Sequence, residues 1–190
     1  MLSFSEFADR LESGQSNVWA PQLSLTGRAD DDGGLGSACE LLPDLEYPTV
    51  LKGAHLDEVN VWIGRGSTPF HFDGYDNLLA VIRGTKTVSL LEPEYFEGLY
   101  IHKFQWISVD VDDRDLVSFP RLTSVPQPLA LVLQESEMLY LPAHWMHQVG
   151  VPYGYAVTLN YWYRCQHGIE AFGVRQVLLW GAGEHAWAVR

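Results

Sequence analysis

Positive charge and cysteine are both scarce in this chain of 190 residues. Twelve Lys and Arg stand against 24 Asp and Glu, which gives a formal net charge of -12. Such a chain repels phosphate backbones, so we expect no nucleic-acid partner, and basic peptides or basic protein surfaces are favoured instead. The two cysteines, Cys39 and Cys165, lie far apart without a Cys-x-x-Cys motif. This argues against a zinc ribbon and does not establish a disulfide.

Long apolar segments are missing too. No run approaches the roughly 20 apolar residues that cross a bilayer, and the first residues lack the basic region and apolar core of a signal peptide. We therefore expect a cytoplasmic protein with no membrane association. The composition that is present, 47% apolar and 13% aromatic residues, is typical of a packed globular protein. We expect one domain over residues 1–190, long enough to bury a sizeable core.

Short apolar segments bounded by turn signals fill the middle of the chain. They do not alternate with long helices, so the pattern predicts an all-β sandwich or jelly roll with its core over about 58–163. We expect the segments 77–83 and 86–91 to form two strands joined by a tight turn at Gly84. We also expect 156–163 to pair with 148–151 through the turn at 152–154.

Helical patterns flank this predicted core. Ser3 is an N-cap candidate, and Phe4, Phe7 and Leu11 are spaced for one apolar face of a first helix. A second helix is predicted at about 167–181, where apolar residues recur at helical spacing before two glycines. That helix would either pack on a partner subunit, giving a homodimer, or cover the sheet of its own chain.

The candidate metal ligands include a histidine and an aspartate at alternate positions of one predicted strand. His71 and Asp73 are two residues apart, so on an extended strand their side chains leave the same face. With one more imidazole they would form the facial triad that suits non-haem Fe(II). His147, at the start of a predicted strand, is the better third ligand, whereas His144 lies in the preceding turn and is expected to face solvent.

Lys86 is predicted to point inward. It shares one face of its strand with Val88 and Leu90, and the apolar set should face the core. A buried ammonium is costly unless an anion meets it. Two interpretations stay open from the residues alone. In the first, Lys86 forms an internal salt bridge or snorkels to the strand end. In the second, Lys86 binds the carboxylate of a bound acid.

Several motifs in order resemble one known family. They run from about Val59 to Tyr163 and read Val61-Trp-Ile-Gly, Thr68-Pro-x-His-x-Asp, Asp76-Asn-Leu-Leu-Ala, Gly84-x-Lys, Leu141-Pro-x-x-Trp-x-His and Leu159-Asn-Tyr-Trp. Together they resemble the small JmjC or cupin-like 2-oxoglutarate oxygenases, which include the asparaginyl hydroxylase acting on hypoxia-inducible factor. The resemblance implies a double-stranded β-helix core and an enzyme that uses Fe(II), 2-oxoglutarate and O₂.

The resemblance also implies a set of site residues. His71, Asp73 and His147 would bind iron. The co-substrate would be held by Thr68, Asn77, Lys86 and Asn160, with Lys86 pairing the distal carboxylate. The tyrosine that usually helps to hold the co-substrate has no clear counterpart; Trp19 is the nearest candidate, or else the role is lost. Pocket walls are expected from the aromatic residues Trp62, Tyr75, Tyr140 and Trp162, which could equally belong to the core.

Three functions are compatible with these residues. The first is a dioxygenase that hydroxylates a side chain of a protein or peptide. The second is a hydroxylase of a small metabolite in a biosynthetic pathway. The third is a metal-binding cupin module without catalysis, against which the intact triad and lysine weigh. The residues do not distinguish hydroxylation from demethylation.

Overall fold

The computed structural model describes residues 4–15, 19–26, 53–100, 113–164, 177–180 and 186–189, together with 43, 45, 47, 48, 51, 109 and 111. One α-helix, α1 (Phe4–Glu12), precedes a series of strands. The strands are β1 (Trp19–Ser24), β2 (Leu56–Gly64), β3 (Tyr75–Arg83), β4 (Lys86–Leu91), β5 (Leu129–Leu133), β6 (Met138–Leu141), β7 (Met146–Gly150), β8 (Ala156–Arg164), β9 (Val177–Trp180) and β10 (Ala186–Val189). Two short 3-10 helices, η2 (Pro93–Tyr95) and η3 (Pro120–Ser124), lie between β4 and β5.

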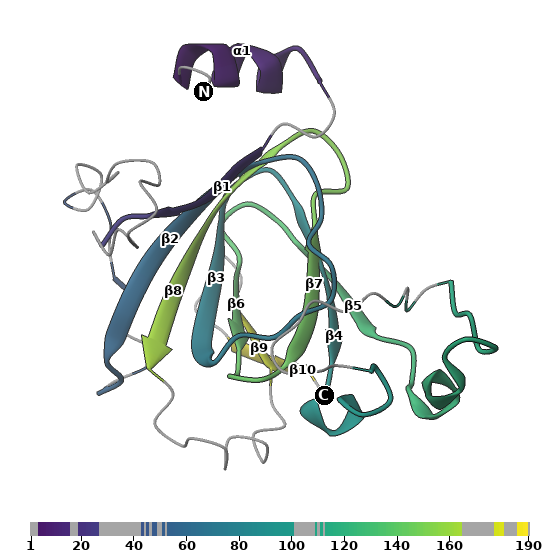
Figure 1. Cartoon of the computed structure of the whole chain (residues 1–190). Helices are drawn as coiled ribbons and strands as arrows, with labels where there is room; N and C mark the ends of the chain where they lie inside the picture. The colour runs from purple at the N-terminus through teal and green to yellow at the C-terminus, as the bar shows by residue number, and fades with distance from the viewer. Residues whose placement is uncertain are drawn as a thin grey trace, which may run out of the picture.

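The strands form two antiparallel sheets that face each other (Figure 1). The larger sheet has the order β1-β2-β8-β3-β6-β9-β10, and the smaller has the order β5-β4-β7. The segment before β3 extends the smaller sheet, because Ser67 and His71 bridge to Gly150 and His147 of β7. The predicted all-β core is therefore confirmed, and the arrangement is consistent with a jelly roll.

Of the two predicted flanking helices, the N-terminal one is present and part of the C-terminal one is a strand. Helix α1 lies where the first helix is predicted and buries Leu11. At the other end, Val177–Trp180 is strand β9, which pairs with β6 and β10. The predicted C-terminal helix is wrong over those residues, and its remaining part, 167–176 and 181, lies outside the described residues. The expectation of a homodimer through that helix stays a prediction.

Gly84 carries the chain from one sheet to the other. The two segments around it do form strands, but β3 pairs with β6 and β8, whereas β4 pairs with β5 and β7. Gly84 has φ +84°, and a Cβ built there would lie 2.3 Å from the carbonyl oxygen of Tyr155. Only glycine satisfies both the positive φ and this close approach. Sequence spacing suggested a hairpin here because a tight turn and a crossover between sheets have the same local signals.

The turn after β7 also connects the two sheets. Strand β8 pairs with β2 and β3, and β7 pairs with β4, so the predicted pairing of 148–151 with 156–163 is wrong. These two crossovers, which lie side by side, let neighbouring strands come from distant parts of the chain. His71 and His147 become neighbours in this way.

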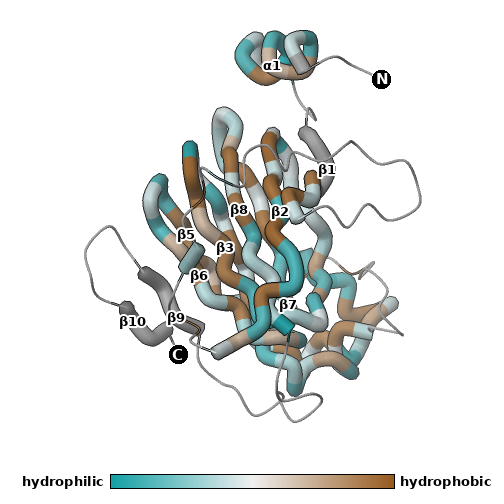
Figure 2. The backbone as a smooth tube through the Cα atoms, turned by 90° about the vertical axis from the view of Figure 1, so that its left-hand side faces the viewer, coloured by the Kyte–Doolittle hydropathy of each residue, from teal (hydrophilic) through white to brown (hydrophobic). Residues whose placement is uncertain are grey.

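Apolar side chains fill the space between the sheets on one side of the interior. Leu79, Val81, Leu139 and Leu141 of the larger sheet pack against residues of β4 and β5 such as Leu133. Each such fully buried side chain contributes about 1.5 to 3 kcal/mol. A second cluster covers the outer face of β2, β3 and β8, and apolar bands run along these strands in Figure 2. The polar part of the interior therefore lies beside one apolar cluster, and the other cluster covers the opposite face of the larger sheet.

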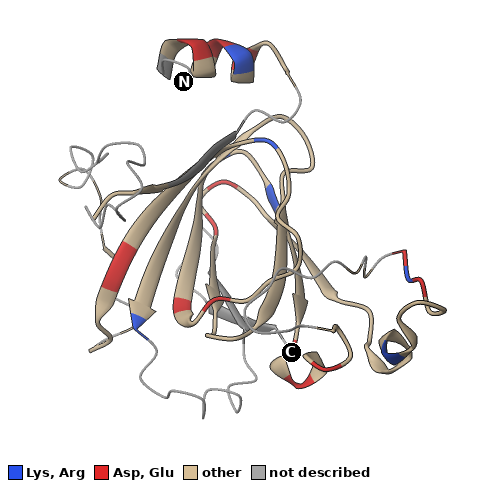
Figure 3. Ribbon diagram, viewed as in Figure 1, with Lys and Arg blue, Asp and Glu red and all other residues tan. Residues whose placement is uncertain are grey.

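Charge is spread thinly over the described ribbon, with acidic segments outnumbering basic ones (Figure 3). Within the described residues, no helix combines the length and the hydrophobicity that a bilayer crossing would require.

Candidate active site

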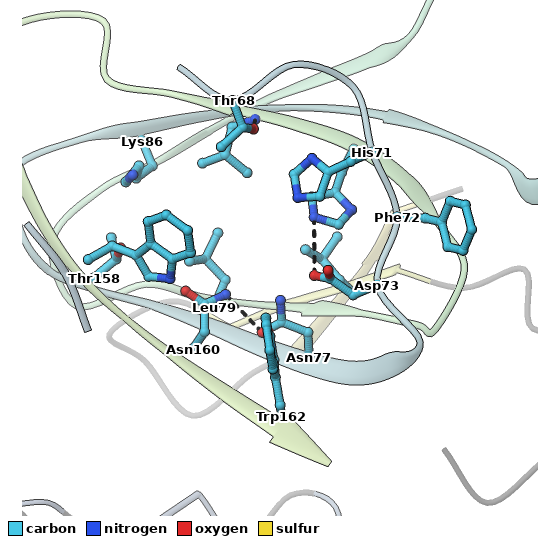
Figure 4. A pocket seen from close by; sticks show the side chains of 14 residues that line it. Thr68, His71, Phe72, Asp73, Asn77, Leu79, Lys86, Thr158, Asn160 and Trp162 are labelled. Carbon is cyan, nitrogen blue, oxygen red and sulfur yellow. Dashed lines mark hydrogen bonds and ion pairs between the residues drawn. The ribbon is translucent and has the colours of Figure 1, made fainter. Parts of the chain in front are cut away.

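A cavity of about 220 Å³ opens between the two sheets (Figure 4). Residues of β3 and β8 form one wall, and residues of β4, β7 and the segment 68–73 form the other. Its lining consists of Trp62, Thr68, His71, Phe72, Asp73, Asn77, Leu79, Lys86, Leu141, His147, Val149, Thr158, Asn160 and Trp162. All seven residues predicted to hold metal or co-substrate are in this set.

His71, Asp73 and His147 meet at one end of the cavity. Their candidate ligand atoms all lie within 4.8 Å of one another, and His147 Nε2 lies 3.6 Å from Asp73 Oδ2. The two histidines are held in register by a pair of backbone bonds: His71 N donates to His147 O (3.0 Å) and His147 N to His71 O (2.7 Å). The two histidines of the triad therefore stand on paired β segments, and Asp73 follows two residues after His71.

Both imidazoles are oriented by a carbonyl two residues earlier in the chain. His71 Nδ1 lies 2.9 Å from Pro69 O, and His147 Nδ1 lies 2.9 Å from Trp145 O. A carbonyl oxygen only accepts, so the proton is assigned to Nδ1 and the lone pair to Nε2 in each ring. Burial, and then the adjacent His147, lowers the pKa of His71 to about 4, so this ring is neutral near pH 7. Two imidazoles that each direct Nε2 away from a carbonyl partner, together with one carboxylate, are a donor set that fits ferrous iron.

Lys86 lies across the cavity from the triad (Figure 4). Burial lowers the pKa of its ammonium to about 8. The predicted inward orientation is confirmed, and no carboxylate pairs with it in the parts of the chain that the structure describes. A buried cation facing a cavity is a site for an anionic group of a ligand.

Three further polar side chains lie between these two ends. Asn160 Nδ2 donates to Asn77 Oδ1 at 3.0 Å, which links neighbouring strands across the cavity floor. Thr68 Oγ1 accepts a bond from Val149 N at 3.1 Å, so its own hydroxyl proton stays available for a ligand. The cavity thus presents amide and hydroxyl groups along its length.

The predicted aromatic walls are only partly right. Trp62 and Trp162 line the cavity, but Tyr75 stacks on Trp162 with ring centroids 5.1 Å apart. Tyr140 instead donates its hydroxyl to Asp76. His144, expected to face solvent, is half-buried with its ring 5.8 Å from that of Phe72.

Trp19 begins β1, and its side chain lies outside the described residues, so its role stays a prediction. The sequence patterns also missed five lining residues, Phe72, Leu79, Leu141, Val149 and Thr158. Two of them carried a signal: Leu79 and Thr158 lie two residues from Asn77 and Asn160, and alternation places them on the same face.

The fold and this site define a cupin-like protein. The model of the family described as cupin-like domain matches residues 1–168, so the chain belongs to that family. Among curated relatives, it is 31% identical over 163 residues to lysine-specific demethylase JMJ32 of Arabidopsis thaliana, covering 67% of this chain and 47% of the relative. It is 30% identical over 161 residues to the human bifunctional peptidase and (3S)-lysyl hydroxylase JMJD7, covering 69% and 50%.

A third relative is lysine-specific demethylase 8 of Danio rerio, 30% identical over 169 residues, with 83% of this chain and 40% of the relative covered. The chain thus spans about half the length of the curated relatives it matches, or less. The suspected relationship to JmjC proteins is confirmed by these matches.

Proposed function

We propose that this protein is an Fe(II)- and 2-oxoglutarate-dependent dioxygenase that hydroxylates a side chain of a protein or peptide. The observation that carries the proposal is the cavity itself. A His-Asp-His cluster converges at one end, and a buried lysine lies at the other, with no carboxylate partner among the described residues. Ferrous iron with the keto-acid and O₂ would supply the oxidising chemistry that inserts oxygen into a substrate C–H bond.

Different residues of the cavity would bind the metal and the co-substrate. His71, Asp73 and His147 would hold the metal from one side and leave the cavity side free for ligands. Lys86 would pair the distal carboxylate of 2-oxoglutarate, a positioning role that directs the opposite end of the acid toward the metal. Thr68, Asn77 and Asn160 would donate or accept hydrogen bonds along the bound acid.

A protein or peptide substrate is supported by the names of the relatives, two of which are lysine-specific demethylases and one a lysyl hydroxylase. The excess of acidic residues favours association with basic segments. A small-metabolite substrate stays the alternative, and the two are separated by the assay below.

The test is succinate release by the iron-loaded protein supplied with 2-oxoglutarate and O₂. We expect slow release without substrate and faster release with a library of lysine- and arginine-containing peptides. Mass spectrometry of the stimulating peptide should show the gain of one oxygen atom; loss of a methyl group would instead identify demethylation. Stimulation by small metabolites alone would favour the alternative, and no succinate under any condition would contradict the proposed activity.

The affinity for 2-oxoglutarate should fall as pH rises through 8. The lowered pKa of Lys86 is about 8, so its ammonium is protonated below that pH and neutral above it. Only the charged form pairs with a carboxylate, so we expect about a tenfold weaker affinity at pH 9 than at pH 7. Calorimetric titration of the Zn(II)-loaded protein measures this, and a Lys86→Met variant should bind weakly at both pH values. If the affinity of Lys86→Met for 2-oxoglutarate falls with pH as steeply as that of the wild type, the pH dependence belongs to another group.

A further inference from the structure

The Asp76 carboxylate ties the strand after the triad to the turn before His147. Asp76 lies near the start of β3, three residues beyond Asp73. Its Oδ1 atom accepts two hydrogen bonds, one from the backbone N of Ala143 at 3.1 Å and one from the hydroxyl of Tyr140 at 3.1 Å. Both donors belong to the end of β6 and the turn that follows it. Hydrogen bonds to an ionised carboxylate are stronger than those between neutral groups.

A second bond, one residue further along, ties the same turn to the triad. His144 N donates to the backbone oxygen of Asp73 at 2.8 Å. His144 also has φ +68°, an uncommon conformation for a residue other than glycine. Such a conformation persists only when surrounding contacts hold it, and the Asp76 and Asp73 bonds on consecutive amides are contacts of that kind.

The turn ends at Trp145, whose carbonyl oxygen orients the ring of the predicted metal ligand His147. Trp145 N donates to Pro142 O at 3.2 Å, which closes the turn. The carbonyl oxygen of Trp145 then lies 2.9 Å from His147 Nδ1. A shift of this turn would move that oxygen and release the ring. The chain of contacts therefore runs from Asp76 through the backbone of the turn to the tautomer of His147.

We propose that Asp76 is a positioning residue that holds the turn 142–145 so that His147 keeps its proton on Nδ1 and presents Nε2 to the metal. This inference rests on the proposed function for its meaning, because it assigns a role toward the same metal site. Asp76 is not among the residues that line the cavity, so it would act through the backbone of the turn. Groups that orient a metal-binding histidine typically change metal affinity by about 10- to 100-fold when removed.

The experiment compares Asp76→Ala with Asp57→Ala as a matched control. Asp57 also holds a hydrogen-bonding partner, Arg164 Nη2 at 2.9 Å, but that partner does not belong to the turn. Two quantities are measured: the tautomer of His147 in the metal-free protein by long-range ¹H–¹⁵N NMR, and the affinity for Zn(II) by calorimetry. We expect Asp76→Ala to populate the Nε2–H tautomer and to bind Zn(II) about tenfold or more weakly. Asp57→Ala should change neither.

Two milder variants keep the test decisive if Asp76→Ala does not fold. Asp76→Asn keeps an acceptor oxygen without the charge and should lose part of the Zn(II) affinity, whereas Tyr140→Phe leaves the Ala143 bond and should keep the tautomer. Wild-type tautomer and Zn(II) affinity in Asp76→Ala, or in Asp76→Asn where the alanine variant is unfolded, overturn the inference. Failure of the wild-type protein to bind Zn(II) counts against the proposed function, and the tautomer in the metal-free protein still decides the role of Asp76.

Discussion

Replacing Asp73 with alanine is expected to abolish succinate release from 2-oxoglutarate. Asp73 is the one carboxylate of the cluster, 3.6 Å from His147 Nε2, and its side chain is 21% exposed toward the cavity. Without it, two neutral imidazoles would hold a divalent cation with no compensating charge, and ferrous iron prefers a site with a carboxylate. Loss of both metal affinity and turnover is the expected outcome, measured by Zn(II) calorimetry and by succinate release with iron.

Two variants accompany this measurement. Asp73→Asn keeps the shape and removes the charge, so it should also lose turnover. Asp57→Asn changes a carboxylate that pairs with Arg164 instead of facing the metal cluster, and it should turn over as the wild type does. Full activity in Asp73→Ala would refute the assignment of this residue as a ligand, and with it the iron enzyme.

Removing the ammonium of Lys86 should weaken the binding of 2-oxoglutarate much more than it affects the metal. Lys86 is the buried cation of the cavity, and burial has already lowered its pKa to about 8. A carboxylate that reaches it therefore forms a largely desolvated pair. Truncating one partner of such a pair costs about 2 to 5 kcal/mol, which is about 30-fold or more in the dissociation constant. Lys86→Met keeps the length and apolar volume of the side chain.

The comparison uses calorimetric titration of the Zn(II)-loaded proteins with 2-oxoglutarate. Arg83→Ala is the matched loss of a positive charge: Arg83 is exposed at the end of β3, with its guanidinium over the ring of Tyr155. We expect wild-type affinity in Arg83→Ala and wild-type Zn(II) affinity in both variants. Equal affinity for 2-oxoglutarate in Lys86→Met would remove Lys86 from the co-substrate site and leave the triad assignment standing.

Local patterns were sufficient for residues that lie two apart on one extended segment. The spacing of His71 and Asp73, and of Lys86 with Val88 and Leu90, places each set on one face by alternation alone. The structure agrees in both cases. Alternation holds because successive side chains of an extended chain must leave opposite faces, whatever the strand pairs with.

Local patterns did not determine which strands pair with each other. Gly84 and the turn at 152–154 signal a reversal of the chain, but the strands on either side of each turn belong to different sheets. At Val177–Trp180, apolar residues at helical spacing form a strand because β6 offers an edge to pair with. In each case a contact with a distant segment decides between conformations that the local sequence permits.

Taken by itself, the sequence determined an all-β core, the inward-facing lysine and the three residue types of the triad, since these depend on composition and on alternation along single strands. Only the tertiary structure decided that His147 pairs directly with His71, that Lys86 has a cavity in front of it, and that Asp76 reaches the turn 142–145. These features arise where the chain crosses between two sheets, and the free energy that selects such crossings comes from packing of residues far apart in sequence.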